Sequence, residues 1–130
     1  MRAVDTNILV RLVARDDLEQ RPVARAVMAA GDVLILPTVL LEAEWVLRSR
    51  YRLPRRQIAE GLSTLCAQEG VAIASGKAVA AALEAYAEGG DFADHLHFAL
   101  AAEQGATAFA TFDRAFTAAG GAGPALELLA

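Results

Sequence analysis

The stretch Val33-Leu-Ile-Leu36 decides the fold class, because it is a continuous apolar run of strand length that Pro37 ends. A strand without alternating polar residues is typically buried on both faces, as the strands of parallel sheets are. Helical patterns flank this run, over residues 18–30 before it and 38–51 after it. The sequence therefore predicts an α/β domain with a mainly parallel sheet.

The same alternation of short apolar strands and helices runs along the rest of the chain. Further strands are predicted at residues 3–5, 71–74, 108–111 and, at an edge, 125–129. Further helices are predicted at residues 8–13, 54–68, 76–88, 91–104 and about 115–119. This order predicts a three-layer α/β/α sandwich around a four- to five-stranded sheet. At 130 residues we expect one domain over residues 1–130.

Charge is distributed unevenly along the chain. The net charge is −4, which argues against indiscriminate binding of nucleic acid. Residues 1–56 nevertheless carry 10 basic and 7 acidic residues, whereas residues 57–130 carry 2 basic and 9 acidic ones. Eleven of the 12 basic residues are arginine, whose guanidinium group matches phosphates and carboxylates. An anionic partner could thus meet a local basic surface, or the arginines could form only a solvated turn.

Acidic residues fall where predicted strands end or the following helices begin. They are Asp5, Glu42, Asp91, Asp94 and Asp113. Each one alone is readily explained as a helix cap or as a charge that favours a helix N-terminus. Ligands bind at the carboxyl ends of the strands in a parallel sheet, so these acids could also share one edge. Crowded carboxylates repel one another, and a hard cation such as Mg²⁺ or Mn²⁺ would relieve that repulsion.

Short motifs in this order resemble the PIN-domain ribonucleases and, among them, the VapC-type toxins of bacterial toxin–antitoxin pairs. The matching pieces are Val4-Asp-Thr-Asn-Ile8, Leu40-Leu-Glu-Ala-Glu-Trp-Val-Leu-Arg-Ser-Arg-Tyr51, Asp91-Phe-Ala-Asp-His-Leu96, Ala99-Leu-Ala-Ala102 and Ala110-Thr-Phe-Asp-Arg-Ala-Phe116. The resemblance extends from residue 3 to about residue 117. Two residues depart from the family pattern: His95 replaces a small apolar residue, and Glu44 replaces an uncharged one.

The resemblance implies hydrolysis of RNA phosphodiester bonds that depends on Mg²⁺ or Mn²⁺. It assigns catalytic and metal-binding roles to Asp5, Glu42, Asp94 and Asp113. It assigns supporting roles to Thr6, Asn7 and Thr111, and leaves Asp91 as either a helper of the site or only a helix cap. No protein nucleophile is needed for such chemistry, because bound cations activate water.

The same resemblance implies partners and a cell compartment. It implies a homodimer and a cognate antitoxin protein that covers the acidic pocket. A cytoplasmic protein is expected, because the chain has a single cysteine, Cys66, and no apolar run of membrane-spanning length. Candidate RNA contacts are Arg11 and three arginines of the 48–56 cluster, namely Arg50, Arg52 and Arg55.

Other functions remain open from the sequence. Phospho-aspartate domains also place an acid after the first strand, but they need a lysine late in the chain, and Lys77 precedes the wrong helix. A PIN-like module that binds RNA or protein without catalysis is the main alternative. His95 and His97 are two residues apart on a predicted helix, so they point in different directions and cannot bind one ion together.

Overall fold

A computed structural model describes residues 1–116, 118 and 123–129 of the chain. The chain divides into two compact units, Met1–Gly76 and Lys77–Ala130, and each is described by itself. The predicted helix at about 115–119 falls partly on residues outside this description. Among the described residues, no helix is both long enough and apolar enough to cross a membrane.

The first unit contains a parallel sheet of three short strands. They are β1 (Arg2–Ala3), β2 (Val33–Ile35) and β3 (Val71–Ile73), in the order β1-β2-β3. Ala3 pairs with Leu34, and Leu34 pairs with Ala72, so the carboxyl ends of all three strands lie at one edge. The central strand is the one that the sequence marked by its apolar run, and both Val33 and Ile35 are buried.

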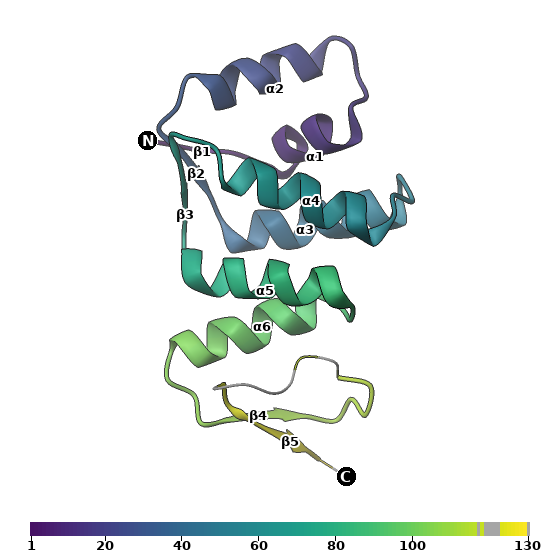
Figure 1. Cartoon of the computed structure of the whole chain (residues 1–130), viewed down its shortest axis with the longest axis vertical. Helices are drawn as coiled ribbons and strands as arrows, with labels where there is room; N and C mark the ends of the chain where they lie inside the picture. Colours follow the sequence, from purple (N-terminus) through teal and green to yellow (C-terminus); the bar gives the residue numbers. More distant parts are fainter. Residues whose placement is uncertain (117, 119–122, 130) are drawn as a thin grey trace. The chain divides into compact units, whose positions relative to one another are not determined.

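Four helices connect these strands. They are α1 (Thr6–Ala14), α2 (Gln20–Ala29), α3 (Pro37–Ser49) and α4 (Arg55–Cys66). Pro37 occupies the first turn of α3, where its missing N–H group costs nothing. Figure 1 shows α1, α3 and α4 packed against one another beside the sheet. The fully buried side chains between them include Leu9, Leu40, Leu47, Ile58 and Leu62.

Glycine allows two close approaches in the first unit. A Cβ atom on Gly61 of α4 would lie 2.8 Å from Cγ1 of Val13 in α1, so the missing side chain lets these helices pack closely. Gly70 has a φ of +82°, and a Cβ atom there would lie 3.0 Å from the Cα atom of Gly31. Glycine therefore also permits the two loops that precede β2 and β3 to pass each other.

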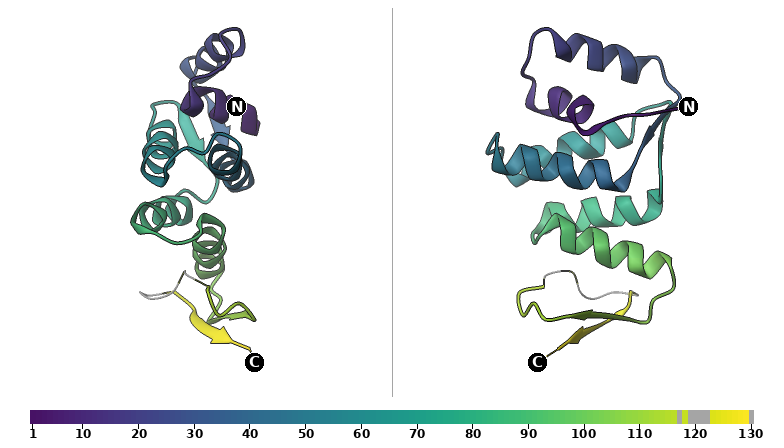
Figure 2. Two further views of the ribbon diagram at one scale, coloured as in Figure 1. Left: turned by 90° about the vertical axis from the view of Figure 1, so that its right-hand side faces the viewer. Right: turned by 180° about the vertical axis from the view of Figure 1, so that it is seen from behind.

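The second unit contains two helices and a separate two-stranded sheet. Helices α5 (Gly76–Glu88) and α6 (Phe92–Glu103) lie side by side in the views of Figures 1 and 2. Tyr86 and Phe92 join them through rings whose centroids are 5.3 Å apart. Strands β4 (Ala108–Thr111) and β5 (Ala125–Leu128) pair in parallel, and Phe109 of β4 packs against Phe98 of α6.

The predicted α/β fold class with parallel strands is confirmed. The strands differ from the expectation in one respect, since they form sheets of three and two strands in place of one four- to five-stranded sheet. Strand β2 has a partner on each side, and β4 pairs with β5 along all four of their residues.

Candidate functional site

Asp5 and Thr6 lie where β1 ends and α1 begins. Asp5 is the N-cap of α1, with extended backbone angles, and its Oδ1 atom accepts a hydrogen bond of 2.7 Å from the Thr6 N–H group. The Asp5 side chain stays exposed, whereas Thr6 is only 6% exposed. The capping interpretation of Asp5 is therefore correct, and it leaves the second carboxylate oxygen available for another role.

Glu42 comes from α3, the helix that follows the neighbouring strand. Its Oε1 atom accepts a hydrogen bond from the Thr6 hydroxyl group, across 36 residues of sequence. Glu42 is the sixth residue of α3, which places it beyond the first turn, where caps and the helix dipole act. Helix capping therefore does not explain its position. Thr6 bonds both Asp5 and Glu42 and so brings the two carboxylates to one edge of the sheet.

The chemistry of this pair suits a hard cation. Thr6 occupies one oxygen of each carboxylate, and no other described residue bonds Oδ2 of Asp5 or Oε2 of Glu42. Carboxylate oxygens without cysteine or histidine are the ligands that Mg²⁺ and Mn²⁺ prefer. Within the described part of the chain, however, no group of three or more His, Cys, Asp or Glu residues is gathered as a metal site.

Asp91 and Asp94 lie at the start of α6 in the second unit. Asp91 is the N-cap, and its Oδ1 atom accepts a hydrogen bond of 3.1 Å from the Asp94 N–H group. Asp91 is thus a helix cap in the structure. Asp94 lies in the first turn of α6 and is half-buried.

His95 supports the turn that precedes α6. Its Nε2 atom lies 2.7 Å from the carbonyl oxygen of Gly89, and because a carbonyl only accepts, Nε2–H is the donor. The ring therefore fastens the Gly89–Gly90 turn to the helix. His97 is exposed.

Asp113 follows β4 in the second unit. Its N–H group donates to the Thr111 hydroxyl group at 3.0 Å, and its Oδ1 atom accepts from the Ala115 N–H group at 2.8 Å. Thr111 thus lies beside this acid. The Asp113 side chain is exposed and caps a turn, so one of its oxygens is already used.

Asn7 lies beside Asp5 at the entrance of a pocket between α1 and α2. The pocket has a volume of about 400 Å³, and its lining includes Asp5, Asn7, Arg11 and Val23. Val23 is 62% exposed and adds an apolar side chain from α2 to the lining. Asn7 is exposed and is available to a ligand near Asp5.

Nearly the whole sequence matches one protein family. Residues 2–122 match the PIN domain, and this match spans both units and all of the acids described above. The chain belongs to the PIN-domain family. A comparison with curated proteins finds none that matches. PIN domains have a nuclease-like fold and are generally metal-dependent nucleases, commonly of RNA.

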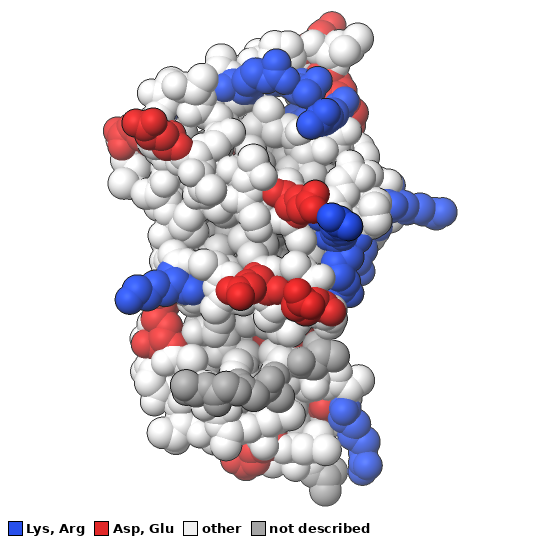
Figure 3. All heavy atoms as spheres, in the orientation of Figure 1, with Lys and Arg blue, Asp and Glu red and all other residues white. Residues whose placement is uncertain are grey.

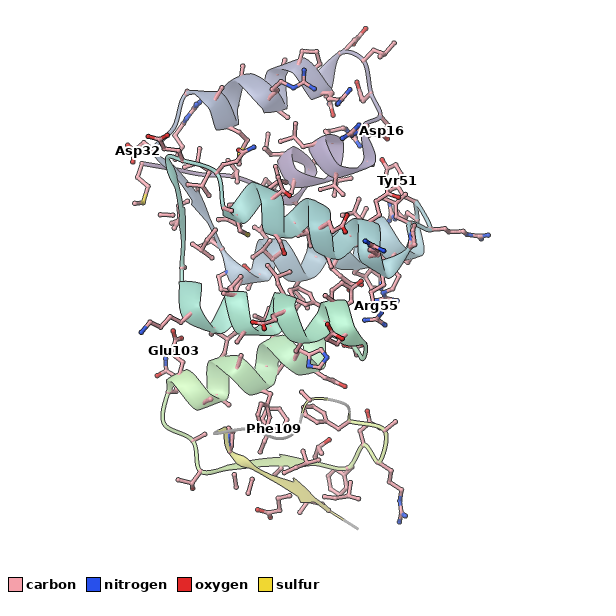
Figure 4. The ribbon with its side chains drawn as sticks, in the orientation of Figure 1. Asp16, Asp32, Tyr51, Arg55, Glu103 and Phe109 are labelled. Atoms are coloured by element: carbon pink, nitrogen blue, oxygen red, sulfur yellow. The ribbon has the colours of Figure 1, made fainter. Side chains whose placement is uncertain are left out.

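Arg11 of this PIN domain is held by its neighbours. Its side chain is 20% exposed, Nε donates to Oε1 of Gln20 at 2.8 Å, and Nη1 donates to the Tyr51 hydroxyl group at 3.0 Å. The Tyr51 hydroxyl group in turn donates to Oδ2 of Asp16 at 2.6 Å, and Figure 4 labels both residues. This hydrogen bond to Asp16 raises the pKa of Tyr51 above its usual value, and burial adds to the rise.

This network lowers the availability of Arg11 for RNA. Besides Gln20 and Tyr51, two carboxylates engage its guanidinium group, since Asp16 lies 3.6 Å from Nη1 and Asp17 lies 3.7 Å from Nε. The sequence pattern did not predict this network, because Tyr51 is 40 residues from Arg11 and 35 residues from Asp16. Only the packing of the α1–α2 loop on the end of α3 brings them together.

The other candidate arginines surround the turn between α3 and α4 of the PIN domain. Arg50, Arg52 and Arg55 are all exposed, and Figure 3 shows basic side chains gathered at this turn. The guanidinium carbon of Arg50 lies 6.0 Å from the centre of the Trp45 ring. The backbone of Arg52 is left-handed, with a φ of 55°. The cluster therefore forms an exposed turn, which is compatible with either open interpretation.

The departures from the family pattern have local explanations. Glu44 is only 3% exposed, and its Oε2 atom accepts a 2.7 Å hydrogen bond from Nε of Arg48, one turn later in α3. The extra acid is therefore a paired, buried charge.

Cys66 at the end of α4 is half-buried, and burial raises the pKa of its thiol to about 11, which makes it a poor nucleophile.

Proposed function

We propose that this PIN domain is a metal-dependent endoribonuclease. The observation that carries the proposal is the hydrogen bond from the Thr6 hydroxyl group to Glu42, which joins that acid to Asp5 and which helix capping does not explain. The family match over residues 2–122 supports the reaction class. A cation of the Mg²⁺ or Mn²⁺ type is the proposed cofactor, since the donors are hard oxygens.

Four acids are proposed as metal ligands and catalytic residues: Asp5, Glu42, Asp94 and Asp113. For Asp5 and Glu42 the support is their common partner Thr6. For Asp94 and Asp113 the support is the family match, which spans both units. We accordingly propose that residues 1–130 form one PIN domain. When bound, the cation would lower the pKa of an attacking water and stabilise the leaving oxygen.

The residues of the chain have distinct proposed tasks. Thr6 holds Glu42 so that one of its oxygens points away from the hydrogen bond and stays free to orient a cation or a water. Asn7 is a polar contact for the RNA near Asp5, and Thr111 positions the backbone before Asp113. Asp91 supports Asp94 by capping α6. The exposed Arg50, Arg52 and Arg55 offer phosphate contacts, while Arg11 is the weakest of the four candidates.

The biological setting proposed here is that of a toxin in a type II toxin–antitoxin pair. The support is the order of short motifs that resembles VapC-type toxins, such as Val4-Asp-Thr-Asn-Ile8. This setting would make the protein cytoplasmic, homodimeric and inhibited by a cognate antitoxin. Trp45 is 49% exposed on α3, which gives a dimer an aromatic contact to bury.

The first test is calorimetric titration of the antitoxin-free protein with Mn²⁺. Wild type should bind the ion, whereas Asp5→Asn and Glu42→Gln should each bind it at least tenfold more weakly, because each loses a charged ligand. Glu84→Gln is the matched control, since it removes an exposed acid from α5. Ion binding that is equal in Glu42→Gln and in wild type would remove Glu42 from the site.

Cleavage is the second half of that test. A mixed pool of single-stranded RNA should be cut by wild type with Mn²⁺, and not by Asp5→Asn. If folded wild type does not bind Mn²⁺ and does not cut RNA, the ribonuclease proposal is replaced by the alternative, a PIN-like binding module without catalytic activity.

A further inference from the structure

A second pocket of the first unit is lined by three arginines that the nuclease proposal does not use. It has a volume of about 460 Å³ and lies between the end of α1, one face of α2 and the residues that follow α4. The charged residues in its lining are Arg15, Arg21, Arg25 and Glu69. Three arginines against one glutamate leave an excess of two positive charges. Figure 3 shows basic side chains along α2.

None of these arginines has an ion pair or a side-chain hydrogen bond among the described residues. By contrast, Arg11, Arg48 and Arg56 of the same unit each have a carboxylate partner within 4.0 Å. Glu69 lies in the same lining and still does not pair with any of the three. The positive charge of the pocket is therefore uncompensated.

Arg21 is the least satisfied of the three arginines. Its Nε atom is buried and has no hydrogen-bond partner among the described residues. A buried donor on a charged group is costly when it is left unpaired. Arg21 and Arg25 are also four residues apart on α2, where two like charges repel each other. One anion bound between the two guanidinium groups would offset the repulsion between their charges.

A phosphate group fits these requirements. Arginine presents several N–H groups in a plane, and two arginines can bind different oxygens of one phosphate. The Gln68 side chain, also in the lining, offers a further N–H donor. We propose that the pocket of Arg15, Arg21 and Arg25 binds a backbone phosphate of single-stranded RNA, apart from the acidic residues. The assignment of this phosphate to RNA rests on the proposed ribonuclease function, whereas the binding of phosphate by the pocket does not.

The experiment measures binding without divalent metal, so that neither cleavage nor the acids affect the result. Wild type is titrated with inorganic phosphate, followed by NMR, and with a short single-stranded RNA lacking terminal phosphates, followed by fluorescence anisotropy. Arg21→Gln should weaken phosphate binding on the order of tenfold, the factor for one charge-assisted hydrogen bond. It should also lower the slope of log affinity against log salt by about 0.7 to 1.

Two further variants make the result specific. Arg25→Gln changes an exposed residue, so it tests the same pocket if Arg21→Gln folds poorly. Glu69→Gln removes the acid of the lining and should strengthen the binding of both phosphate and RNA. Glu103→Gln makes the same charge change in α6 and should leave both affinities unchanged. The control for lost positive charge is Arg56→Gln, because Arg56 lies outside this pocket and is paired with Glu60.

The outcomes separate the two sources of phosphate. Phosphate and RNA binding that both depend on Arg21 would support the proposal. Phosphate binding that depends on Arg21, with RNA binding that does not, would overturn the RNA assignment in favour of a free phosphate-bearing molecule. Equal affinities of Arg21→Gln and Arg56→Gln for phosphate and for RNA would overturn the proposal that this pocket binds phosphate. A failure to cleave RNA in the presence of metal would count against the proposed function, but it would not change any of these conclusions about the pocket.

Discussion

At the scale of single residues, Thr6 does the most to shape the candidate site. It is nearly fully buried, yet it is polar, and both its N–H group and its hydroxyl group bond to a carboxylate. The sequence identified Thr6 only as a residue that supports Asp5. Its second partner, Glu42, could not be predicted from spacing, because the contact depends on how α1 and α3 pack.

Replacing Thr6 with valine tests this role. Thr6→Val keeps the shape of the side chain but removes the hydroxyl donor, so Glu42 loses its fixed orientation. We expect a loss of about 1 kcal/mol in the free energy of unfolding. Mn²⁺ binding should weaken by a larger factor than this small loss of stability explains. Urea unfolding and calorimetry measure the two effects.

Thr6→Ser is the control for that substitution, because it keeps the hydroxyl group. It should restore most of the metal binding even if it loses some packing. Equal metal affinities for the serine and valine variants would show that the hydrogen bond does not position Glu42.

Tyr51 should make stability sensitive to alkaline pH. The hydrogen bond to Asp16 raises the pKa of Tyr51 in the folded state above its ordinary value of 10.0. The folded protein thus holds the phenol proton more tightly than the unfolded chain does. The resulting stabilisation is complete below about pH 10 and is lost as the pH rises through the folded pKa.

The measurement is urea unfolding of wild type and Tyr51→Phe from about pH 8 to about pH 11. Wild type should lose stability more steeply than the variant above about pH 10. Asp16→Asn should bring the titration of Tyr51 closer to its usual pKa. A difference between wild type and Tyr51→Phe that stays constant with pH would contradict this account.

At the scale of elements, most helices and strands could be predicted from local patterns. The helix Gly76–Glu88 and the strand Ala108–Thr111 have the predicted bounds, because glycines and apolar runs mark them clearly. The second helix begins at Gln20 and not at residue 18. Leu18 resembles the start of an apolar face but is 91% exposed, and Asp17 bonds the N–H groups of Glu19 and Gln20 instead.

The contact between α1 and α4 gives a prediction at this scale. Gly61→Ala places a methyl group 2.8 Å from Cγ1 of Val13, which is short and β-branched and cannot move aside easily. Overpacking lowers the free energy of unfolding by about 1–3 kcal/mol, whereas replacing a helical glycine with alanine raises it by about 1 kcal/mol. We therefore expect a net destabilisation, measured by thermal or urea unfolding.

A double variant identifies the cause. Val13→Ala alone should destabilise the protein, since it leaves a cavity at a residue that is 7% exposed. In that background Gly61→Ala should become neutral or stabilising, because the new methyl group fills the space. A Gly61→Ala effect of the same size in both backgrounds would show that the helices do not meet through these two residues.

At the scale of the whole molecule, the sequence predicted the fold class better than it predicted which strands pair. Local apolar runs specify which segments are strands, but they do not specify which strands pair. That choice depends on long-range packing, and here β4 and β5 pair with each other. The acids show the same limit. The pattern drew attention to all of them, and the structure shows a common partner, Thr6, for Asp5 and Glu42.

The proposal of one domain predicts a single cooperative unfolding transition. Trp45, the only tryptophan, reports on the first unit, whereas far-ultraviolet circular dichroism also reports on α5 and α6 of the second. The two signals should change at the same temperature, and the calorimetric and van't Hoff enthalpies should agree. Transitions at two separate temperatures would show that the units unfold as independent domains.

The hydrogen bond between Thr6 and Glu42 also has a consequence for how the protein is made. Because 36 residues separate the two partners, a large loop must close before they meet. A nascent chain that has emerged only as far as β2 still lacks α3 and therefore lacks the pair of acids. The two acids proposed as metal ligands therefore come together only as the first unit folds, after translation has passed α3.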